Sequence, residues 1–136
     1  MKIGAPKEVF EGEKRVALTP QSAIALKKLG YDSLVESGAG EAARFSDEAY
    51  REAGVTVVPT AADLWAQADV VAKVRPPEPS EVALSRTGQI IVSFLYPGQN
   101  GELLERLQDQ GVTAVAMDMV PRISRAQKMD ALSSKA

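Results

Sequence analysis

Short runs of β-branched residues alternate with amphipathic segments along the whole chain, and this alternation constrains the fold more than any other feature. No Asn-Gly or Asp-Gly pair joins two of these runs as a tight hairpin. Strands that are separated by helices in this way form a parallel sheet that is covered on both faces. We therefore expect one three-layer α/β domain over residues 1–136, with a mostly parallel, Rossmann-like or flavodoxin-like sheet flanked by helices.

The expected helices begin at recognisable capping residues. Thr19-Pro20, Ser46 and Thr60 each place a capping side chain directly before a helical segment. A further helix is expected from Asn100, and a last one from Ser124 to the C-terminus. Three prolines, at positions 76, 77 and 79, are expected to end the fourth strand. The six expected strands cover residues 2–5, 33–36, 55–58, 70–74, 89–94 and 112–117.

The chain contains neither cysteine nor histidine, which excludes whole classes of chemistry. Disulfides, thiolate nucleophiles, imidazole metal sites and a Ser-His-Asp triad are impossible within these 136 residues. The formal net charge of -2 gives no basic excess that would indicate a nucleic-acid partner. The N-terminus lacks the apolar stretch of a signal peptide, and no apolar run is long enough to span a bilayer. We expect a soluble, cytoplasmic domain without direct membrane insertion.

Polar side chains gather where the expected strands end. Ligands of open parallel sheets bind beyond the carboxyl ends of the strands, where cations from separate strands can converge on a phosphate or a carboxylate. The alternative is that these long basic side chains only occupy solvated loops. The residues are Arg15 after the first strand, Lys73 and Arg75 at the fourth, Tyr96 and Gln99 after the fifth, and Arg122 and Arg125 after the sixth.

The segment after the sixth expected strand has the most distinctive pattern. Gln127, Asp130 and Ser133 recur every three residues, which keeps them near one face of a helix. A neighbouring apolar face would be formed by Ile123, Ala126, Met129 and Leu132. Amide, carboxylate and hydroxyl groups in a row could hydrogen-bond a nicotinamide amide and ribose hydroxyls. The spacing alone favours the alternative, an ordinary amphipathic helix with a polar outer side.

The segment Gly38-Ala39-Gly40-Glu41-Ala42-Ala43 matches the loose G-x-G-x-x-A dinucleotide pattern after a strand. In a true fingerprint the helix opens directly and offers its amides to the pyrophosphate. Here the helical signals restart only at Ser46. We therefore interpret the segment as a turn between a strand and a helix.

Taken together, the motifs resemble the alanine dehydrogenase/transhydrogenase family over essentially the whole chain. The stretches 93–100 (SFLYPGQN) and 116–134 (AMDMVPRISRAQKMDALSS) resemble the transhydrogenase branch specifically. Further matching segments are residues 3–8, 13–20, 35–40 and 69–76.

Alanine dehydrogenase, the other branch, resembles the chain less closely. Its pattern has a lysine at the position of Arg75 and a histidine at the position of Tyr96, although Arg15 matches. Without the histidine, the chain lacks the acid–base group that amino-acid oxidation is expected to need.

The transhydrogenase resemblance implies a component that binds NAD(H) and passes hydride to NADP(H) on another component. In the membrane enzyme of this family the exchange is coupled to proton translocation. Such a site works by orientation, because hydride transfer is the cofactor's own reaction, so no catalytic side chain and no metal are expected. By the same resemblance, the cofactor-binding residues around the nicotinamide are Arg122, Gln127, Asp130 and Ser133.

The resemblance also implies parts of a parent protein that lie beyond Ala136. Members of the family continue into a Rossmann domain that holds most of the dinucleotide. We therefore expect weak NAD(H) binding, or none, and no catalysis by this chain alone. Its expected partners are that missing dinucleotide-binding domain and the NADP(H)-binding component, in a membrane-associated complex.

Other hypotheses stay open. One is a non-catalytic folding unit that self-associates, for instance as a homodimer, through the surface that a partner domain would cover. Another is a binder of a small ligand that uses Arg15, Lys73 and Arg75. Lys128 and Lys135 stand at positions that are usually uncharged in the family motif. One hypothesis is that the domain was excised and charge was added where an apolar surface had been exposed, and the other is natural variation on a solvated face.

Overall fold

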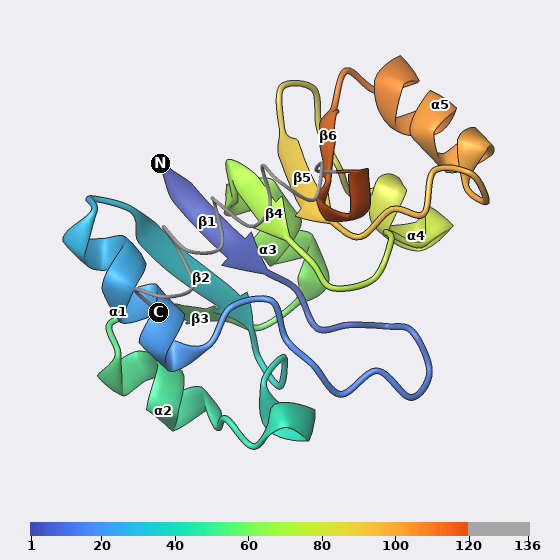
Figure 1. Ribbon diagram of the computed structural model, residues 1–136. Helices are drawn as coiled ribbons and strands as arrows, with labels where there is room; N and C mark the ends of the chain where they lie inside the picture. Colours follow the sequence, from blue (N-terminus) through green and yellow to red (C-terminus); the bar gives the residue numbers. More distant parts are fainter. Residues whose placement is uncertain (120–136) are drawn as a thin grey trace.

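The computed structural model describes residues 1–119, in which strands and helices alternate as the sequence predicts (Figure 1). The strands are β1 (Lys2–Ala5), β2 (Asp32–Glu36), β3 (Thr56–Val58), β4 (Val70–Ala72), β5 (Ile90–Ser93) and β6 (Thr113–Ala116). The α-helices are α1 (Pro20–Lys28), α2 (Asp47–Glu52), α3 (Ala61–Gln67), α4 (Pro79–Val82) and α5 (Gly101–Asp109). Two 3₁₀ turns, η1 (Glu41–Ala43) and η2 (Met117–Met119), follow β2 and β6.

The six strands form one sheet in the order β3-β2-β1-β4-β5-β6, and every described pair is parallel. This is the strand order of the Rossmann fold, which narrows the expected Rossmann-like or flavodoxin-like sheet to the first type. The order reverses between β1 and β4, so the topological switch point lies at the carboxyl ends of these two strands.

Capping side chains start the helices where the sequence predicts. The hydroxyl of Thr19 accepts a hydrogen bond from the backbone N–H of Ser22, whose own hydroxyl accepts from Thr19 N–H, so α1 begins with a complete capping box. Ser46 accepts from Ala49 N–H at the start of α2, and Thr60 accepts from Asp63 N–H at the start of α3.

The sheet separates two hydrophobic cores. On one face α3, α4 and α5 supply Leu64, Trp65, Val82 and Leu107, and on the other α1 and α2 supply Ala23 and Tyr50. In Figure 1, α1 lies in front of the sheet and α3 lies behind it. The three layers that the alternation predicts are therefore confirmed.

The helix α4 was not expected, because the prolines at positions 76, 77 and 79 were predicted only to end the fourth strand. Pro79 is the first residue of this one-turn helix, where proline loses no hydrogen bond. Glu78 and Glu81 cap it reciprocally through each other's backbone N–H. Neither α4 nor any other helix within residues 1–119 is long and apolar enough to cross a bilayer.

Candidate functional site

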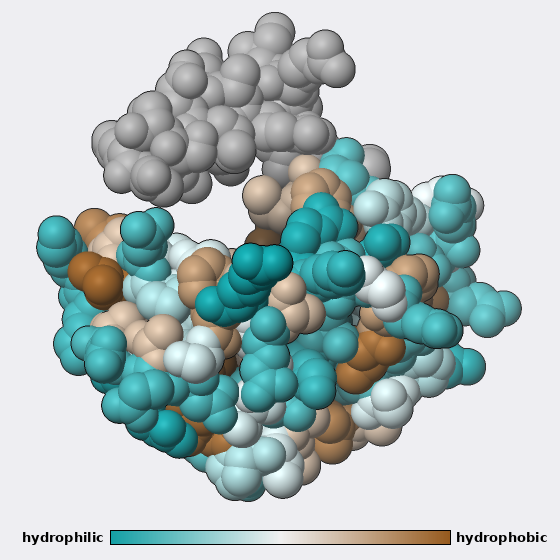
Figure 2. Space-filling model, turned by 90° about the horizontal axis from the view of Figure 1, so that it is seen from below, coloured by the Kyte–Doolittle hydropathy of each residue, from teal (hydrophilic) through white to brown (hydrophobic). Residues whose placement is uncertain are grey.

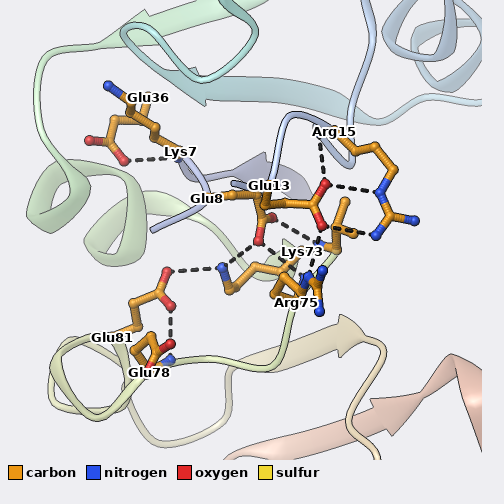
Figure 3. A network of polar contacts seen from close by, with 10 residues as sticks. Lys7, Glu8, Glu13, Arg15, Glu36, Lys73, Arg75, Glu78 and Glu81 are labelled. Carbon is orange, nitrogen blue, oxygen red and sulfur yellow. Dashed lines mark hydrogen bonds and ion pairs between the residues drawn. The ribbon is translucent and has the colours of Figure 1, made fainter. Parts of the chain in front are cut away.

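Charged side chains crowd the switch point between β1 and β4. They come from the loop of residues 6–18 after β1 and from residues 73–81 after β4, two segments that the sheet order brings side by side (Figure 3). The sequence indicated this region by its basic residues alone, but acidic residues supply about half of its charged side chains.

Lys73 lies at the centre of one buried cluster. Its ammonium nitrogen is 3.1 Å from Glu8 Oε1 and 3.1 Å from Glu81 Oε2, and the three side chains are 1%, 3% and 5% exposed. Figure 3 shows the lysine pointing between the two carboxylates. The interpretation that the basic side chains only occupy solvated loops is therefore wrong for Lys73, because its charge is internally paired and shielded from water.

Glu8 also closes the end of β4. Its carboxylate accepts hydrogen bonds from the backbone N–H groups of Val74 (2.8 Å) and Arg75 (3.1 Å) as well as from Lys73. In other folds with this strand order, a ligand's anionic group binds near this position. Here a carboxylate of the chain itself takes these donors, so Lys73 is not available to an external ligand.

Burial raises the pKa of Glu81, and the neighbouring Lys73 opposes that shift. Two carboxylates share one ammonium in this cluster, so Lys73 cannot fully compensate both charges. Removal of the single cation would leave buried carboxylates unpaired, which is far more costly than loss of a surface ion pair.

Glu13 joins Arg15 and Arg75. Its Oε1 lies 2.8 Å from both Arg15 Nη2 and Arg75 Nε, and its Oε2 accepts from Arg15 Nε and from the Arg15 backbone N–H, each at 2.9 Å. These bonds, led by that of the Arg15 side chain, hold the pKa of Glu13 far below its usual range although burial acts against them. Glu13 therefore stays ionised and fixes both guanidinium groups.

A cavity of about 950 Å³ opens between the loops that follow β4 and β5. The Arg75 guanidinium lies at its wall, 4.2 Å from the centre of the Phe10 ring, a geometry in which the ring face attracts the cation. Polar lining residues include Tyr96, Gln99, Asn100 and Arg106. The cavity has the size of a small-molecule site, and its charged lining residues are two cations, Arg75 and Arg106, and two carboxylates, Glu78 and Glu102.

The loop after β5 is held in place by η2, the 3₁₀ turn after β6. The Asp118 carboxylate accepts from the backbone N–H groups of Leu95 (3.0 Å) and Tyr96 (2.8 Å), and the Asn100 side-chain amide donates to Leu95 O. Tyr96 has a φ of 47°, a conformation that costs a non-glycine residue energy. Tyr96 is also among the groups that, after Glu13, raise the pKa of Arg15.

The G-x-G-x-x-A segment is a turn over residues 38–40 that continues into the 3₁₀ element η1, which the sequence analysis did not predict, and the α-helix begins only after Ser46, as predicted. A Cβ on Gly40 would lie 2.6 Å from the Tyr50 ring, so this glycine permits close packing. The N–H of Gly38 donates to Asp47 Oδ1 at 3.0 Å, and this bond, followed by that of the Ser37 hydroxyl, lowers the pKa of Asp47. Both glycines therefore take part in contacts within the protein: Gly40 allows Tyr50 to pack closely, and the Gly38 N–H binds Asp47.

The structure brings some of the predicted residues together. Arg75, Tyr96 and Gln99 line the larger cavity, and Arg15 lines a neighbouring hollow of about 150 Å³. The acidic partners Glu8, Glu13 and Glu81 were missed, and for Glu8 and Glu13 the reason is that their contacts join segments up to 67 residues apart. The predicted nicotinamide residues Arg122, Gln127, Asp130 and Ser133, with Arg125, lie outside the described residues.

Known proteins are similar to this chain in sequence and in fold. Residues 4–136 match the family model described as "Alanine dehydrogenase/PNT, N-terminal domain". The chain is 62% identical over its whole length to NAD(P) transhydrogenase subunit alpha of Cereibacter sphaeroides, and spans 26% of that protein. It is 40% identical to alanine dehydrogenase of Bacillus subtilis, over 88% of this chain and 32% of that protein.

A solved structure agrees with these sequence matches. The transhydrogenase of Sinorhizobium meliloti superposes with a TM-score of 0.89 and 41% identity, over 99% of this chain and 40% of that one. The chain thus spans a quarter to two fifths of these transhydrogenase relatives. From its sequence and its fold, the chain belongs to the alanine dehydrogenase/PNT N-terminal domain family.

Proposed function

We propose that this chain is the N-terminal domain of the NAD(H)-binding component of an NAD(P) transhydrogenase, and that it contributes contacts on the nicotinamide side of the nucleotide. The observation that carries the proposal is the 62% identity over all 136 residues to a transhydrogenase alpha subunit. The parent protein would transfer hydride between NAD(H) and NADP(H), together with an NADP(H)-binding component.

The proposed contacts would be made by Arg122, Gln127, Asp130 and Ser133, the residues that the family resemblance implies for the nicotinamide site. They would act by fixing the ring relative to the hydride acceptor, and orientation of this kind can supply a large part of a rate enhancement. The chain alone would bind the nucleotide weakly, because it spans only 26% of its transhydrogenase relative.

An NMR titration of the chain with NADH tests these contacts. Saturable shifts of backbone amides concentrated between Arg122 and Ser133 are the expected result. A well-dispersed spectrum that does not change at millimolar NADH would contradict nucleotide binding by this chain. The variant Gln127→Ala should weaken the shifts, whereas Lys28→Ala, on the last turn of α1, should leave them unchanged.

A second candidate is a site for a small anion beside Arg15 and Arg75. Its support is the cavity of about 950 Å³ that Arg75 lines, next to the guanidinium of Arg15. Lys73 is not part of this proposed anion site, because its ammonium group is already paired with Glu8 and Glu81. A titration with pyruvate, alanine and inorganic phosphate separates the two candidates, because shifts at Arg75 and Tyr96 alone would favour the anion site.

An alanine dehydrogenase activity has weaker support. Arg75 and Tyr96 replace the lysine and histidine of that branch, and the identity to the alanine dehydrogenase relative is 40% compared with 62% for the transhydrogenase. A self-associating, non-catalytic unit is the remaining alternative, and sedimentation equilibrium of the chain would reveal a homodimer.

A further inference from the structure

The buried cluster of Glu8, Lys73 and Glu81 differs from the other charged groups of the chain. The surface drawn in Figure 2 is mainly hydrophilic, with hydrophobic residues in small separate groups. Of the charged residues within 1–119, only Lys73 and Glu81 are buried as whole residues. A buried charge is costly unless it is paired, so the balance of charge within this cluster decides how stable its arrangement is.

The cluster holds two carboxylates and one ammonium group. Both carboxylates lie 3.1 Å from Lys73 Nζ, and the three side chains are almost completely shielded from water (Figure 3). With both carboxyls ionised, one negative charge therefore stays uncompensated in the interior. A single bound proton makes the cluster neutral and removes this cost.

Glu81 is the carboxyl that takes this proton. A carboxylate is stabilised by each donor that it binds, and Glu8 accepts from two backbone N–H groups after β4 in addition to Lys73. In the described structure Glu81 accepts from fewer donors, Lys73 and the backbone N–H of Glu78. Burial raises the pKa of Glu81, and Lys73 offsets only part of this effect.

The charged groups that face Glu81 come from two other segments. Lys73 lies directly after β4 and Glu8 in the loop after β1, and the negative charge of Glu8 adds to the effect of burial on Glu81. Around α4, and on α5, which packs against it, the other charged side chains line the cavity. They are two cations and two carboxylates, Arg75, Arg106, Glu78 and Glu102. The excess negative charge therefore lies in the buried cluster.

The two ends of α4 are attached differently. Three of the residues 76–79 are prolines, which have no backbone N–H, and the remaining donor, Glu78 N–H, binds the Glu81 carboxylate at 2.9 Å. At the other end Val82 is buried in the core, and the Gln110 amide donates to its carbonyl at 2.9 Å. A single helical turn is not stable by itself. The polar attachment of the beginning of α4 is therefore the Glu81 carboxyl.

We propose that protonation of Glu81 keeps α4 closed on the buried cluster, and that its ionisation favours an open arrangement in which the carboxylate reaches water. Residues 76–79 all line the cavity, so this opening moves part of the cavity wall. The closure depends on the buried cluster and not on a nucleotide. Its failure and the failure of the proposed function can therefore be told apart.

Linkage gives the direction of this pH dependence. The pKa of Glu81 is raised above 4.5 in the closed arrangement, whereas a glutamate in water keeps about that ordinary value. The closed arrangement therefore binds the proton more tightly and is favoured at low pH. This preference is fully present below about 4.5 and is lost as the pH rises through the raised pKa.

Hydrogen exchange of the full chain, followed by NMR from about pH 4 to about pH 8, tests the proposal. The reporters are the backbone amides of Val82 and Ala83, which donate to Glu78 O and Pro79 O inside α4. Their protection factors should fall as the pH rises, by about tenfold for each unit by which the closed and open pKa values of Glu81 differ.

Two further signals complete the measurement. The amide of Ala68, which donates to Leu64 O in α3, is the internal reference and should keep its protection relative to the reporters' loss. The ¹³C signal of the Glu81 carboxyl should titrate with a midpoint above 4.5.

Three substitutions separate the effect of the proton from that of the ion pair. Glu81→Gln imitates the neutral carboxyl, so the two reporter amides should keep high protection even at about pH 8. Glu8→Gln leaves one carboxylate for the one ammonium group, so it should lower the titration midpoint of Glu81. Glu52→Gln makes the same chemical change at the exposed end of α2 and should change neither quantity.

Three results would overturn the proposal. One is protection of the reporter amides that stays constant or rises with pH in the parent chain. Another is a Glu81 midpoint at or below 4.5. The third is a loss of protection in Glu81→Gln over the whole pH range, since the ion pair with Lys73 and not the proton would then hold α4 in place.

Discussion

At the scale of single residues, Lys73 carries the only positive charge that directly contacts both Glu8 and Glu81 in the described structure. We predict that Lys73→Met destabilises the folded chain by about 3–5 kcal/mol at neutral pH, because it leaves buried carboxylates without their cation. Urea denaturation measures this loss. Lys14→Met, on an exposed loop residue, is the control and should stay within about 0.5 kcal/mol of the parent chain. A loss as small as the control's for Lys73→Met would show that the ion cluster is not needed for stability.

Glu13 gives a residue-scale prediction about pH. Its pKa is lower in the folded chain than in the unfolded one, so the folded state binds fewer protons and this stabilisation is present above the ordinary glutamate range. Glu13→Gln should cost about 1–2 kcal/mol at pH 7, since a charge-assisted bond becomes a neutral one. The cost should shrink as the pH falls below about 4.5, the unperturbed value. Thermal unfolding from pH 7 to pH 3 measures it, with the exposed Glu11→Gln as control, and an unchanged difference would contradict the prediction.

At the scale of secondary-structure elements, the distance between α3 and β1 depends on Gly4. A Cβ on this glycine would lie 2.9 Å from the Cβ of Ala68 and 3.3 Å from Leu64 Cγ. Gly4→Ala should therefore push the helix from the sheet and cost about 1–3 kcal/mol. Gly101→Ala is the matched control, because a Cβ there meets no described atom within 4 Å. Urea denaturation compares the two, and Ala68→Gly should recover part of the loss in the double variant.

The helices and strands were predictable from the local sequence, whereas the order of the strands in the sheet, and so the contacts between distant segments, were not. Thr19, Ser46 and Thr60 cap the helices that they predict, since a cap depends on residues only three positions away. The prediction for Pro79 was wrong, since this residue begins α4. Proline both ends strands and occupies the first position of helices, so the residue type alone does not distinguish the two. The strand order that places Glu8 beside Lys73 is set by packing of segments far apart in the chain, and no local pattern encodes it.

At the scale of the whole molecule, the described residues hold the anchoring part of the candidate site. Asp118 and Asn100 fix the loop that carries Tyr96, and Glu13 fixes Arg15 and Arg75. The sequence indicated the basic residues from their place after the strands, and it could not indicate that acidic residues would pair with them. The nicotinamide contacts stay a prediction, because they rest on a motif beyond residue 119.

A hybrid protein tests that prediction in a complete setting. The chain is 62% identical to its Cereibacter relative over 136 residues, so we expect it to replace the matching part of that subunit with the fold intact. Reduction of an NAD analogue by NADPH, with the NADP(H)-binding component added, measures hydride transfer. Gln127→Ala should lower kcat about tenfold to a hundredfold, because a misplaced nicotinamide reacts slowly. Lys128→Ala, one position along the same segment, should leave kcat within about twofold of the hybrid protein. Equal effects of the two substitutions would assign the loss to the segment's structure and not to a contact of Gln127.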